Sequence, residues 1–349
     1  MNILKKIVIW AMLSIMMQLA GLTFLDRVVF QHASKFEIKT IEPTKKETIK
    51  VSIPEEAEDI SSSYNGRYIK YIEDGKLMLM NTKTAEKKEV VTEEGSEIIY
   101  SSWLTRDNYI MIAEKVNGNV KIVTYNARTG IVKPIIDKLT NYNRGLNIDG
   151  IVTNGSNSKY VGVSRGGFNS TIYRIDVNDD MNKLDFRVPS LNKMVSFQHK
   201  DELVYQDGLN NKFYRYNNRK TNEIKFENGE DLTLLATDEN DNIYMGRLED
   251  DKIVSIIYGK VENPTSSWTT INLESPKKTS DIYVTVKGDV MINDSLKGKI
   301  VNLNTGDTIS YEGKFLQITD KIICSTNEGN LIIKNLSDID SKEEVEDNQ

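Results

Sequence analysis

The sequence contains few of the residues from which catalytic and metal sites are most often built. Among its 349 residues are one cysteine, Cys324, and two histidines, His32 and His199. A single cysteine cannot form an intrachain disulfide, and neither histidine has a second ligand at metal-binding spacing. These shortages argue against a Cys-based zinc finger, a His-based metal site and a Ser-His-Asp triad. We therefore expect no cofactor and no metal, and a protein that binds rather than catalyses.

The sequence also lacks an excess of positive charge. Lys and Arg number 45 against 51 Asp and Glu, which gives a net charge of −6, and no basic block stands out in the body of the chain. A protein that tracks nucleic-acid phosphates needs such a block, so we expect no nucleic-acid partner. Proline is scarce, at 6 residues, and hydrophobic residues make up 39%. This composition is typical of a folded, β-rich chain rather than a disordered one.

One long apolar run is present, and it lies at the N-terminus. It starts at Ile7, after Lys5 and Lys6, and ends at Leu25. About 19 helical residues span roughly 30 Å, the thickness of a bilayer core. Residues 1–30 are therefore predicted to be an uncleaved, single-pass anchor with a cytoplasmic N-terminus and the rest of the chain outside the cytoplasm. The alternative is a cleaved signal peptide, although no Ala-x-Ala site closes the run.

A repeated pattern of turns begins at residue 60. Asn65-Gly66 and Asp74-Gly75 separate short apolar runs, and both dipeptides favour two-residue hairpins. A third turn has the form Asn-x-x-Thr-small, and it starts at Asn81 and again at Asn126, Asn218 and Asn302. The first spacing is 45 residues and the later ones are about twice that. A period of about 40–45 residues built from four strands indicates a β-propeller blade.

The fold class predicted from these repeats is all-β. We expect a propeller of about seven four-stranded blades over residues 58–336, with six or eight blades as alternatives. The last blade, which contains residues 315–334, has only three predicted strands. Residues 48–53, within the charged spacer 31–57, alternate polar and apolar side chains and are predicted to be the ring-closing fourth strand. Residues 337–349 are predicted to be a solvated acidic tail.

The first repeat carries a family resemblance. Residues 63–71 (SYNGRYIKY), followed by residues 77–84 (LMLMNTKT), resemble the blade repeat of TolB-like propellers and of the propeller domain of dipeptidyl peptidase IV. The first turn departs from that repeat because it lacks the proline of a Ser-Pro-Asp-Gly-like turn. No α/β-hydrolase segment follows residue 336 in this sequence. The resemblance therefore implies the fold and carries no peptidase activity.

Several motifs have both a chemical and a structural interpretation. Residues 162–166 spell G-x-S-x-G around Ser164, but a second strand rather than a helix is predicted after them, which favours a hairpin loop over a nucleophile elbow. The acidic turns 176–180 and 238–242 have enough oxygens for calcium, yet such turns are commonly Asx turns, and the second lacks the glycine and glutamate of an EF-hand loop. Trp103 and Trp268 are expected mainly as packing residues.

These observations favour a membrane-anchored, non-catalytic binding or scaffold module at the cell envelope, whose partner is an unknown envelope protein or polymer. The predicted contact is an insertion at residues 137–148 that holds Tyr142 and Arg144, since aromatic and arginine side chains are common at binding hot spots. The alternative is an envelope glycan-processing enzyme. It would need two carboxylates about 5–10 Å apart in the propeller channel.

Overall fold

The computed structural model describes residues 3–24, 48–185, 187–226 and 231–336, and it divides the chain into two compact units, 1–46 and 47–349. In the first unit, α1 (Ile3–Phe24) is a helix with apolar side chains on all sides. No helix in the described part of the chain is both long enough and apolar enough to cross a membrane. The predicted spanning helix is therefore not shown.

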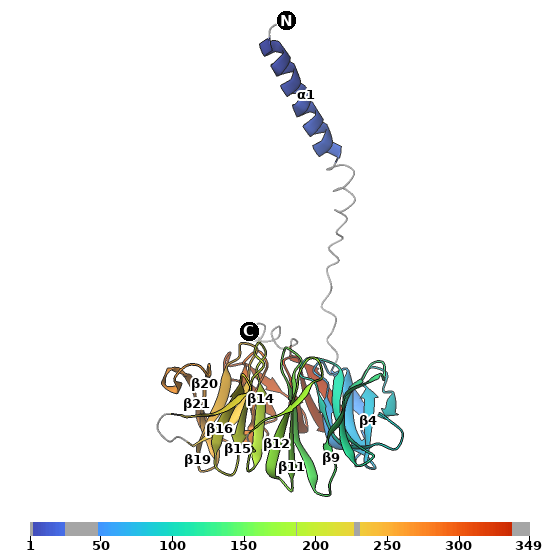
Figure 1. Cartoon of the computed structure of the whole chain (residues 1–349), viewed down its shortest axis with the longest axis vertical. Helices are drawn as coiled ribbons and strands as arrows, with labels where there is room; N and C mark the ends of the chain where they lie inside the picture. Colours follow the sequence, from blue (N-terminus) through green and yellow to red (C-terminus); the bar gives the residue numbers. More distant parts are fainter. Residues whose placement is uncertain (1–2, 25–47, 186, 227–230, 337–349) are drawn as a thin grey trace, which may run out of the picture. The chain divides into compact units, whose positions relative to one another are not determined.

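The second unit is a ring of seven antiparallel sheets with four strands each (Figure 1). The first three sheets, blades 1 to 3, have these strands in order: β2 (Glu58–Ser62), β3 (Tyr68–Glu73), β4 (Lys76–Asn81) and β5 (Lys87–Glu89); β6 (Glu97–Trp103), β7 (Tyr109–Val116), β8 (Asn119–Asn126) and β9 (Val132–Asn141); β10 (Leu146–Thr153), β11 (Lys159–Arg165), β12 (Phe168–Ile175) and β13 (Met181–Lys183). The predicted seven-bladed propeller is confirmed.

Blades 4 to 7 follow the same order. Their strands are β14 (Leu191–Ser196), β15 (Leu203–Asp207), β16 (Lys212–Asn217) and β17 (Lys220–Ile224); β18 (Leu232–Thr237), β19 (Ile243–Glu249), β20 (Lys252–Gly259) and β21 (Thr269–Lys277); β22 (Ile282–Val284), β23 (Val290–Asp294), β24 (Lys299–Asn302) and β25 (Thr308–Ser310); β26 (Lys314–Ile318), β27 (Ile322–Asn327), β28 (Asn330–Asn335) and β1 (Ile49–Ser52). Two short 3₁₀ helices, η3 (Thr265–Ser267) and η4 (Thr279–Asp281), flank β21.

Blade 7 is completed by the strand that comes first in the chain. β1 pairs antiparallel with β28, so that Val51 lies opposite Leu331, and the Ile53 amide donates to the Gly329 carbonyl at 3.0 Å. The Val51 and Ile53 side chains are buried between blades 7 and 1. This is the position predicted for residues 48–53, that of the ring-closing fourth strand. The added strand covers an edge that would otherwise expose unpaired backbone groups.

The hydrophobic core is divided into seven clusters, one between each pair of neighbouring blades. Between blades 1 and 2, for example, Leu79 of β4 packs in one cluster with Ile110 of β7. Each strand alternates its side chains between the two faces of its sheet, so every blade contributes to two clusters. Trp268 packs between blades 4 and 5, as predicted for a packing residue. The first strands of neighbouring blades contact one another and line the centre of the ring.

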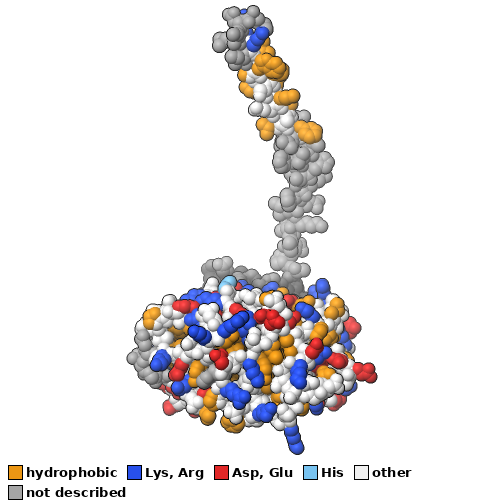
Figure 2. All heavy atoms as spheres, in the orientation of Figure 1, with side chains coloured by type: hydrophobic (Ala, Val, Ile, Leu, Met, Phe, Trp, Pro, Cys, Tyr) orange, Lys and Arg blue, Asp and Glu red, His pale blue; other side chains and the backbone are white. Residues whose placement is uncertain are grey.

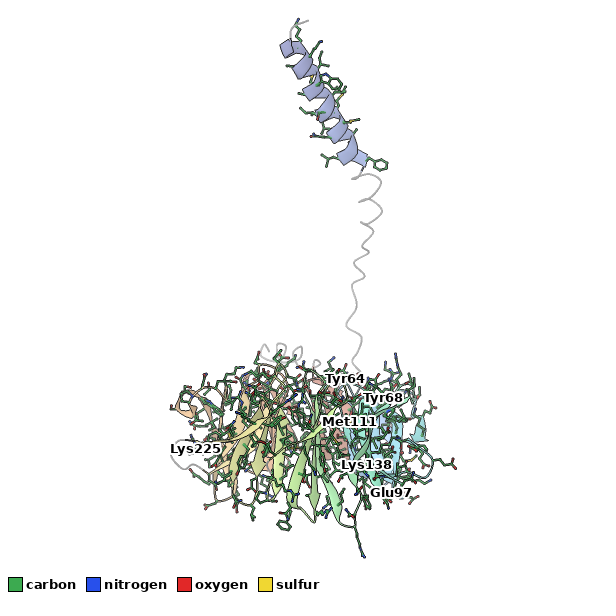
Figure 3. All side chains as sticks on the ribbon, in the orientation of Figure 1. Tyr64, Tyr68, Glu97, Met111, Lys138 and Lys225 are labelled. Carbon is green, nitrogen blue, oxygen red and sulfur yellow. The ribbon has the colours of Figure 1, made fainter. Side chains whose placement is uncertain are left out.

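The ring has two faces, which we name after residues labelled in Figure 3. The Tyr64 face carries the turns between the first and second strands of each blade, and the Glu97 face is the opposite one. On the visible side of the ring, basic and acidic side chains are interspersed without a large patch of one sign (Figure 2). This distribution agrees with the small net charge of the sequence.

Candidate functional site

Two cavities lie at the mouth of the central channel on the Tyr64 face. One has a volume of about 230 Å³ and is lined from blades 2 to 6, and the other has about 240 Å³ and is lined from blades 1, 2, 6 and 7. Both are bounded by the same five residues, which separate them: Trp103, Leu104, Thr105, Val284 and Val286. The mouth is thus one opening divided in two.

The rim of the mouth is built from hydroxyl side chains at the ends of the innermost strands. The Thr237 hydroxyl donates to the Ser196 carbonyl at 2.8 Å, and the Ser196 hydroxyl donates to the Thr153 carbonyl at 2.8 Å. Each bond joins one blade to the blade before it. A hydroxyl that donates in this way still has lone pairs that accept hydrogen bonds. The rim therefore joins the blades and also offers acceptors to a ligand.

The first cavity, which blades 2 to 6 line, contains apolar side chains from five inner strands, among them Ile151, Met194 and Leu235, together with hydroxyl side chains. The second cavity includes one carboxylate, that of Asp320, whose Oδ1 accepts the Val286 amide at 2.8 Å. The residues lining these two cavities therefore do not supply the carboxylate pair that the predicted glycan-processing alternative requires.

A segment of blade 2, residues 103–108, divides the mouth, and we call it the strap. It is held at its base by Trp103, whose indole Nε1 donates to the Ser61 carbonyl at 3.1 Å. At its tip the Arg106 guanidinium forms an ion pair with Glu239 of blade 5, with 2.8 Å between nitrogen and oxygen. The Glu239 amide donates in turn to the Val286 carbonyl of blade 6 at 2.6 Å. Blades 2 and 5 are three positions apart in a ring of seven, so the strap reaches across the mouth.

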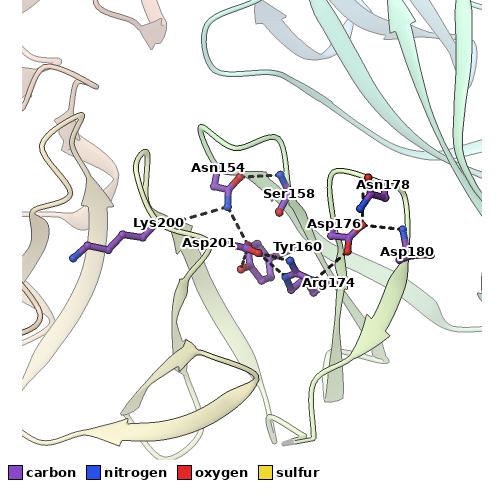
Figure 4. A network of polar contacts seen from close by, with 9 residues as sticks. All are labelled: Asn154, Ser158, Tyr160, Arg174, Asp176, Asn178, Asp180, Lys200 and Asp201. Carbon is purple, nitrogen blue, oxygen red and sulfur yellow. Dashed lines mark hydrogen bonds and ion pairs between the residues drawn. The ribbon is translucent and has the colours of Figure 1, made fainter.

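A second polar cluster joins blades 3 and 4 on the same face (Figure 4). Asp201 is its centre: its carboxylate accepts hydrogen bonds from the Tyr160 hydroxyl at 2.7 Å, from Asn154 Nδ2 at 3.1 Å and from Arg174 Nε at 3.0 Å. Beside it, Gly155 approaches the neighbouring blade so closely that a Cβ there would lie 2.1 Å from the Gln198 carbonyl oxygen. Any side chain at position 155 would therefore push blades 3 and 4 apart.

The electrostatics of this cluster follow from its contacts. Burial alone would raise the pKa of Asp201, but the hydrogen bonds from Arg174 and Tyr160 outweigh burial and hold that pKa below its ordinary value. Burial and the hydrogen bond to Asp201 raise the pKa of Tyr160. Both groups therefore keep their usual protonation states at neutral pH. The cluster is a fixed tie between two blades rather than an acid–base pair.

The G-x-S-x-G motif is part of a β-hairpin. Ser164 lies in β11, and the turn that follows it leads directly into β12. Its hydroxyl donates to Asp149, which also accepts from the Ser170 hydroxyl at 2.9 Å. In a nucleophile elbow the serine lies at a strand-to-helix turn and donates to a histidine, whereas Ser164 lies within a strand and donates to Asp149. The hairpin interpretation is correct.

The acidic turns considered for calcium use their oxygens locally. Asp176 Oδ1 accepts the amides of Asn178 and Asp180, and Asp238 Oδ1 accepts the amides of Asn240 and Asn242. These are Asx turns, in which the side chain satisfies the backbone. In the described ranges, no group of three or more His, Cys, Asp and Glu residues is placed to hold a metal ion.

His199 lies beside one residue of the acidic turn 238–242. His199 is 72% exposed, and its Nδ1 lies 3.5 Å from Asp241 of the next blade. His32 lies outside the described residues.

The prediction that residues 137–148 form an inserted loop is wrong. β9 continues to Asn141 and β10 begins at Leu146, so only residues 142–145 connect the two blades, on the Glu97 face. Tyr142 is half-buried against the core between blades 2 and 3, with Lys115 Nζ 4.7 Å from its ring centroid, whereas Arg144 is exposed. The polar residues that suggested a loop lie on the solvent side of β9, the outermost strand of its blade.

The sequence analysis did not predict the Arg106–Glu239 pair or the Asp201 cluster. Arg106 and Glu239 are 133 residues apart, and Asp201 receives bonds from residues 27 to 47 positions away. None of these separations along the sequence matches the spacing of contacts in a helix or a hairpin. The positions of Arg106 and Glu239 in equivalent turns of two blades were the one available signal.

Comparisons with known proteins agree with the propeller fold. No protein-family model and no curated protein matches the sequence. Among solved structures, the chain is similar to an oligogalacturonate lyase in complex with manganese, with a TM-score of 0.57 and 9% identity over 84% of this chain and 92% of that one. It is also similar to the tricorn protease, with a TM-score of 0.53 and 12% identity over 85% of this chain and 35% of that one.

A TolB from Acinetobacter baumannii is matched as well, with a TM-score of 0.38 and 13% identity over 65% of this chain and 55% of that one. The predicted resemblance to propellers of this kind is confirmed at the level of the fold by the first two structures. At such low identity, these similarities establish the fold alone.

Proposed function

We propose that this chain is a recognition module whose propeller binds a partner at the channel mouth of the Tyr64 face. The observation that carries the proposal is the composition of the mouth. Two adjoining cavities combine apolar side chains with hydroxyl groups and the Asp320 carboxylate, and one charged pair lies at the strap. Binding sites typically combine an apolar lining with a few placed polar groups that fix orientation. The partner is proposed to be an envelope protein or polymer.

Membrane attachment through α1 is the second part of the proposal. Its apolar side chains point outward on every side, with Trp10 71% and Met17 79% exposed. Such a surface is covered by lipid or protein in most settings. Lys5 and Lys6 would remain in the cytoplasm, which places the propeller outside. Protease added to intact cells should then digest residues 47–349, and protection until lysis would contradict this orientation.

Photo-crosslinking in intact cells tests the partner site. A benzoylphenylalanine replaces either Thr105, exposed on the strap, or Arg144, exposed on the Glu97 face. We expect a discrete covalent adduct from position 105 and none from position 144. An adduct from position 144 alone would overturn the mouth as the contact and favour the site predicted from the sequence, and the Tyr142→Ala/Arg144→Ala variant would then lose that partner.

A catalytic alternative is supported by the fold similarity to oligogalacturonate lyase. That similarity concerns the fold, and the lining of the two cavities offers a single carboxylate. We therefore propose a non-catalytic role. Incubation of the purified full-length chain with envelope glycans, with and without manganese, should leave them unchanged. Turnover that is lost in a Thr105→Trp variant, which fills the mouth, would replace the binding proposal with an enzymatic one.

A further inference from the structure

The two halves of the mouth are each small for a ligand site. Their volumes of about 230 and 240 Å³ fall below the roughly 300–1,000 Å³ that is usual for ligand pockets, whereas the two together fall within it. The wall between them consists of strap residues 103–105 on one side and Val284 and Val286 on the other. Movement of the strap would join the two halves into one site.

The strap is held across the mouth by an exposed contact. Arg106 is 50% exposed and Glu239 is 44% exposed, and exposed ion pairs contribute little to stability. The strap tip makes no other ion pair across the channel within the part of the chain that the structure describes. Separation of this pair leaves a guanidinium on blade 2 and a carboxylate on blade 5, next to cavities that contain apolar side chains from several blades.

We propose that the mouth is a single site for a short peptide with free termini, closed in the unliganded protein by the Arg106–Glu239 pair. The peptide carboxylate pairs with Arg106, its ammonium group pairs with Glu239, and its apolar side chains occupy the two halves on either side of the strap. The ligand thus replaces both partners of the ion pair that it separates. An uncharged ligand must break the Arg106–Glu239 pair without forming a new charged contact to either residue. This inference rests on the proposed binding function and names the ligand class for the same site.

The probes are the dipeptide Leu-Leu and its blocked form N-acetyl-Leu-Leu-amide, titrated calorimetrically into the full-length chain in detergent. We expect Leu-Leu to bind about tenfold more tightly than the blocked form, because two charge-assisted contacts favour it. In the Arg106→Gln/Glu239→Gln variant the two probes should bind within about twofold of each other. The ratio of the two affinities is the readout, and it does not depend on how much of the protein is active.

A bridged variant tests the closure separately. Arg106→Cys/Glu239→Cys is suitable because the natural cysteine, Cys324, is buried. Joining the two new cysteines with a short bismaleimide should reduce the affinity for both probes by about tenfold or more relative to the unbridged variant. Equal binding of both probes to the wild-type chain, no binding of either, or unchanged binding after bridging would each overturn the inference. If the peptide inference fails, an adduct at position 105 in cells would still support the proposed function. If Leu-Leu binds but no adduct forms at position 105, the proposed function is contradicted and the peptide inference is not.

Discussion

Two of the arginine–carboxylate contacts on the Tyr64 face differ in their exposure and in their number of hydrogen-bond partners. Between blades 3 and 4, Asp201 is bonded to Arg174 and to two further side chains, and the Arg174 side chain is only 15% exposed. Across the mouth, Arg106 and Glu239 form a single pair that is about half exposed. At this junction the neighbouring blades are fixed by a largely buried arginine and a carboxylate with several hydrogen bonds, whereas blades 2 and 5 are joined at the mouth by one contact that is about half exposed.

The contacts that hold the ring together therefore differ from the contact that closes its mouth. A buried charge that loses its partner destabilises the fold strongly, while an exposed pair can be broken with little change in stability. The ring can therefore stay intact while the strap moves. The following predictions test that separation, beginning with the largest expected effect.

Removal of β1 should have the largest effect, because this strand forms part of the junction between blades 7 and 1. A chain beginning at Glu55 loses the buried Val51 and Ile53 side chains and exposes the edge of β28. We expect the free energy of unfolding to fall by about 3–6 kcal/mol, measured by urea denaturation. A chain beginning at Ser34 is the control and should match the full-length propeller. Equal stability of the two shortened chains would show that β1 does not hold the ring.

Asp201→Ala should be the next most damaging change. It leaves the fully buried Tyr160 hydroxyl without its acceptor, and it leaves the Arg174 guanidinium with Asp176, 3.9 Å away, as an ion-pair partner. A loss of about 2–4 kcal/mol in the free energy of unfolding is expected. Glu239→Ala is the matched control, because it removes an acid from the equivalent turn of the next blade, and it should cost under about 1 kcal/mol. Similar losses in the two variants would remove the distinction between junction and strap.

The stability contribution of Asp201 should disappear at low pH. Because its pKa is lower in the folded chain than in the unfolded one, the contribution is complete above the unfolded value of about 3.9 and is lost as the pH falls through the folded value. The difference in melting temperature between wild type and Asp201→Asn should be constant from pH 7 to about pH 5 and shrink below about pH 4. A difference that shrinks instead on going from pH 5 to pH 8 would contradict this assignment.

Arg106→Gln should have the smallest effect on stability. The side chain is half exposed and has one ion-pair partner, so the free energy of unfolding should change by less than about 0.5 kcal/mol. A loss above about 2 kcal/mol in urea denaturation would mean that the strap is part of the ring and not a separate closure.

The ring could be predicted because the sequence patterns that indicate its strands and turns are short and local. The Asn-x-x-Thr turns repeat at about one or two blade lengths, and β3 and β4 are bounded by the turns at Asn65-Gly66, Asp74-Gly75 and Asn81. The fourth strand of blade 7 was predictable because alternation over residues 48–53 coincided with a blade that lacked one strand. Both arguments need only short windows of sequence.

The mouth could not be predicted, because it depends on contacts between blades. The strap and Glu239 meet only when the ring closes, and Asp201 draws its partners from strands β11 and β12 and from the β10–β11 turn. Residues 137–141 were misread as a loop for a related reason. An outermost strand has one face in water, and the burial of β9 alternates irregularly enough to hide its strand pattern.

Hydrogen–deuterium exchange of the full-length chain tests most directly whether the strap opens while the ring stays closed. Peptides that cover residues 103–108 should exchange at least about tenfold faster than peptides that cover residues 154–160 and 198–203, because local openings range from nearly free to globally costly. The slow set includes the Ser158 amide, which donates to Asn154 Oδ1 at 2.8 Å. Equal protection of the strap and of the blade 3–4 junction would contradict the account.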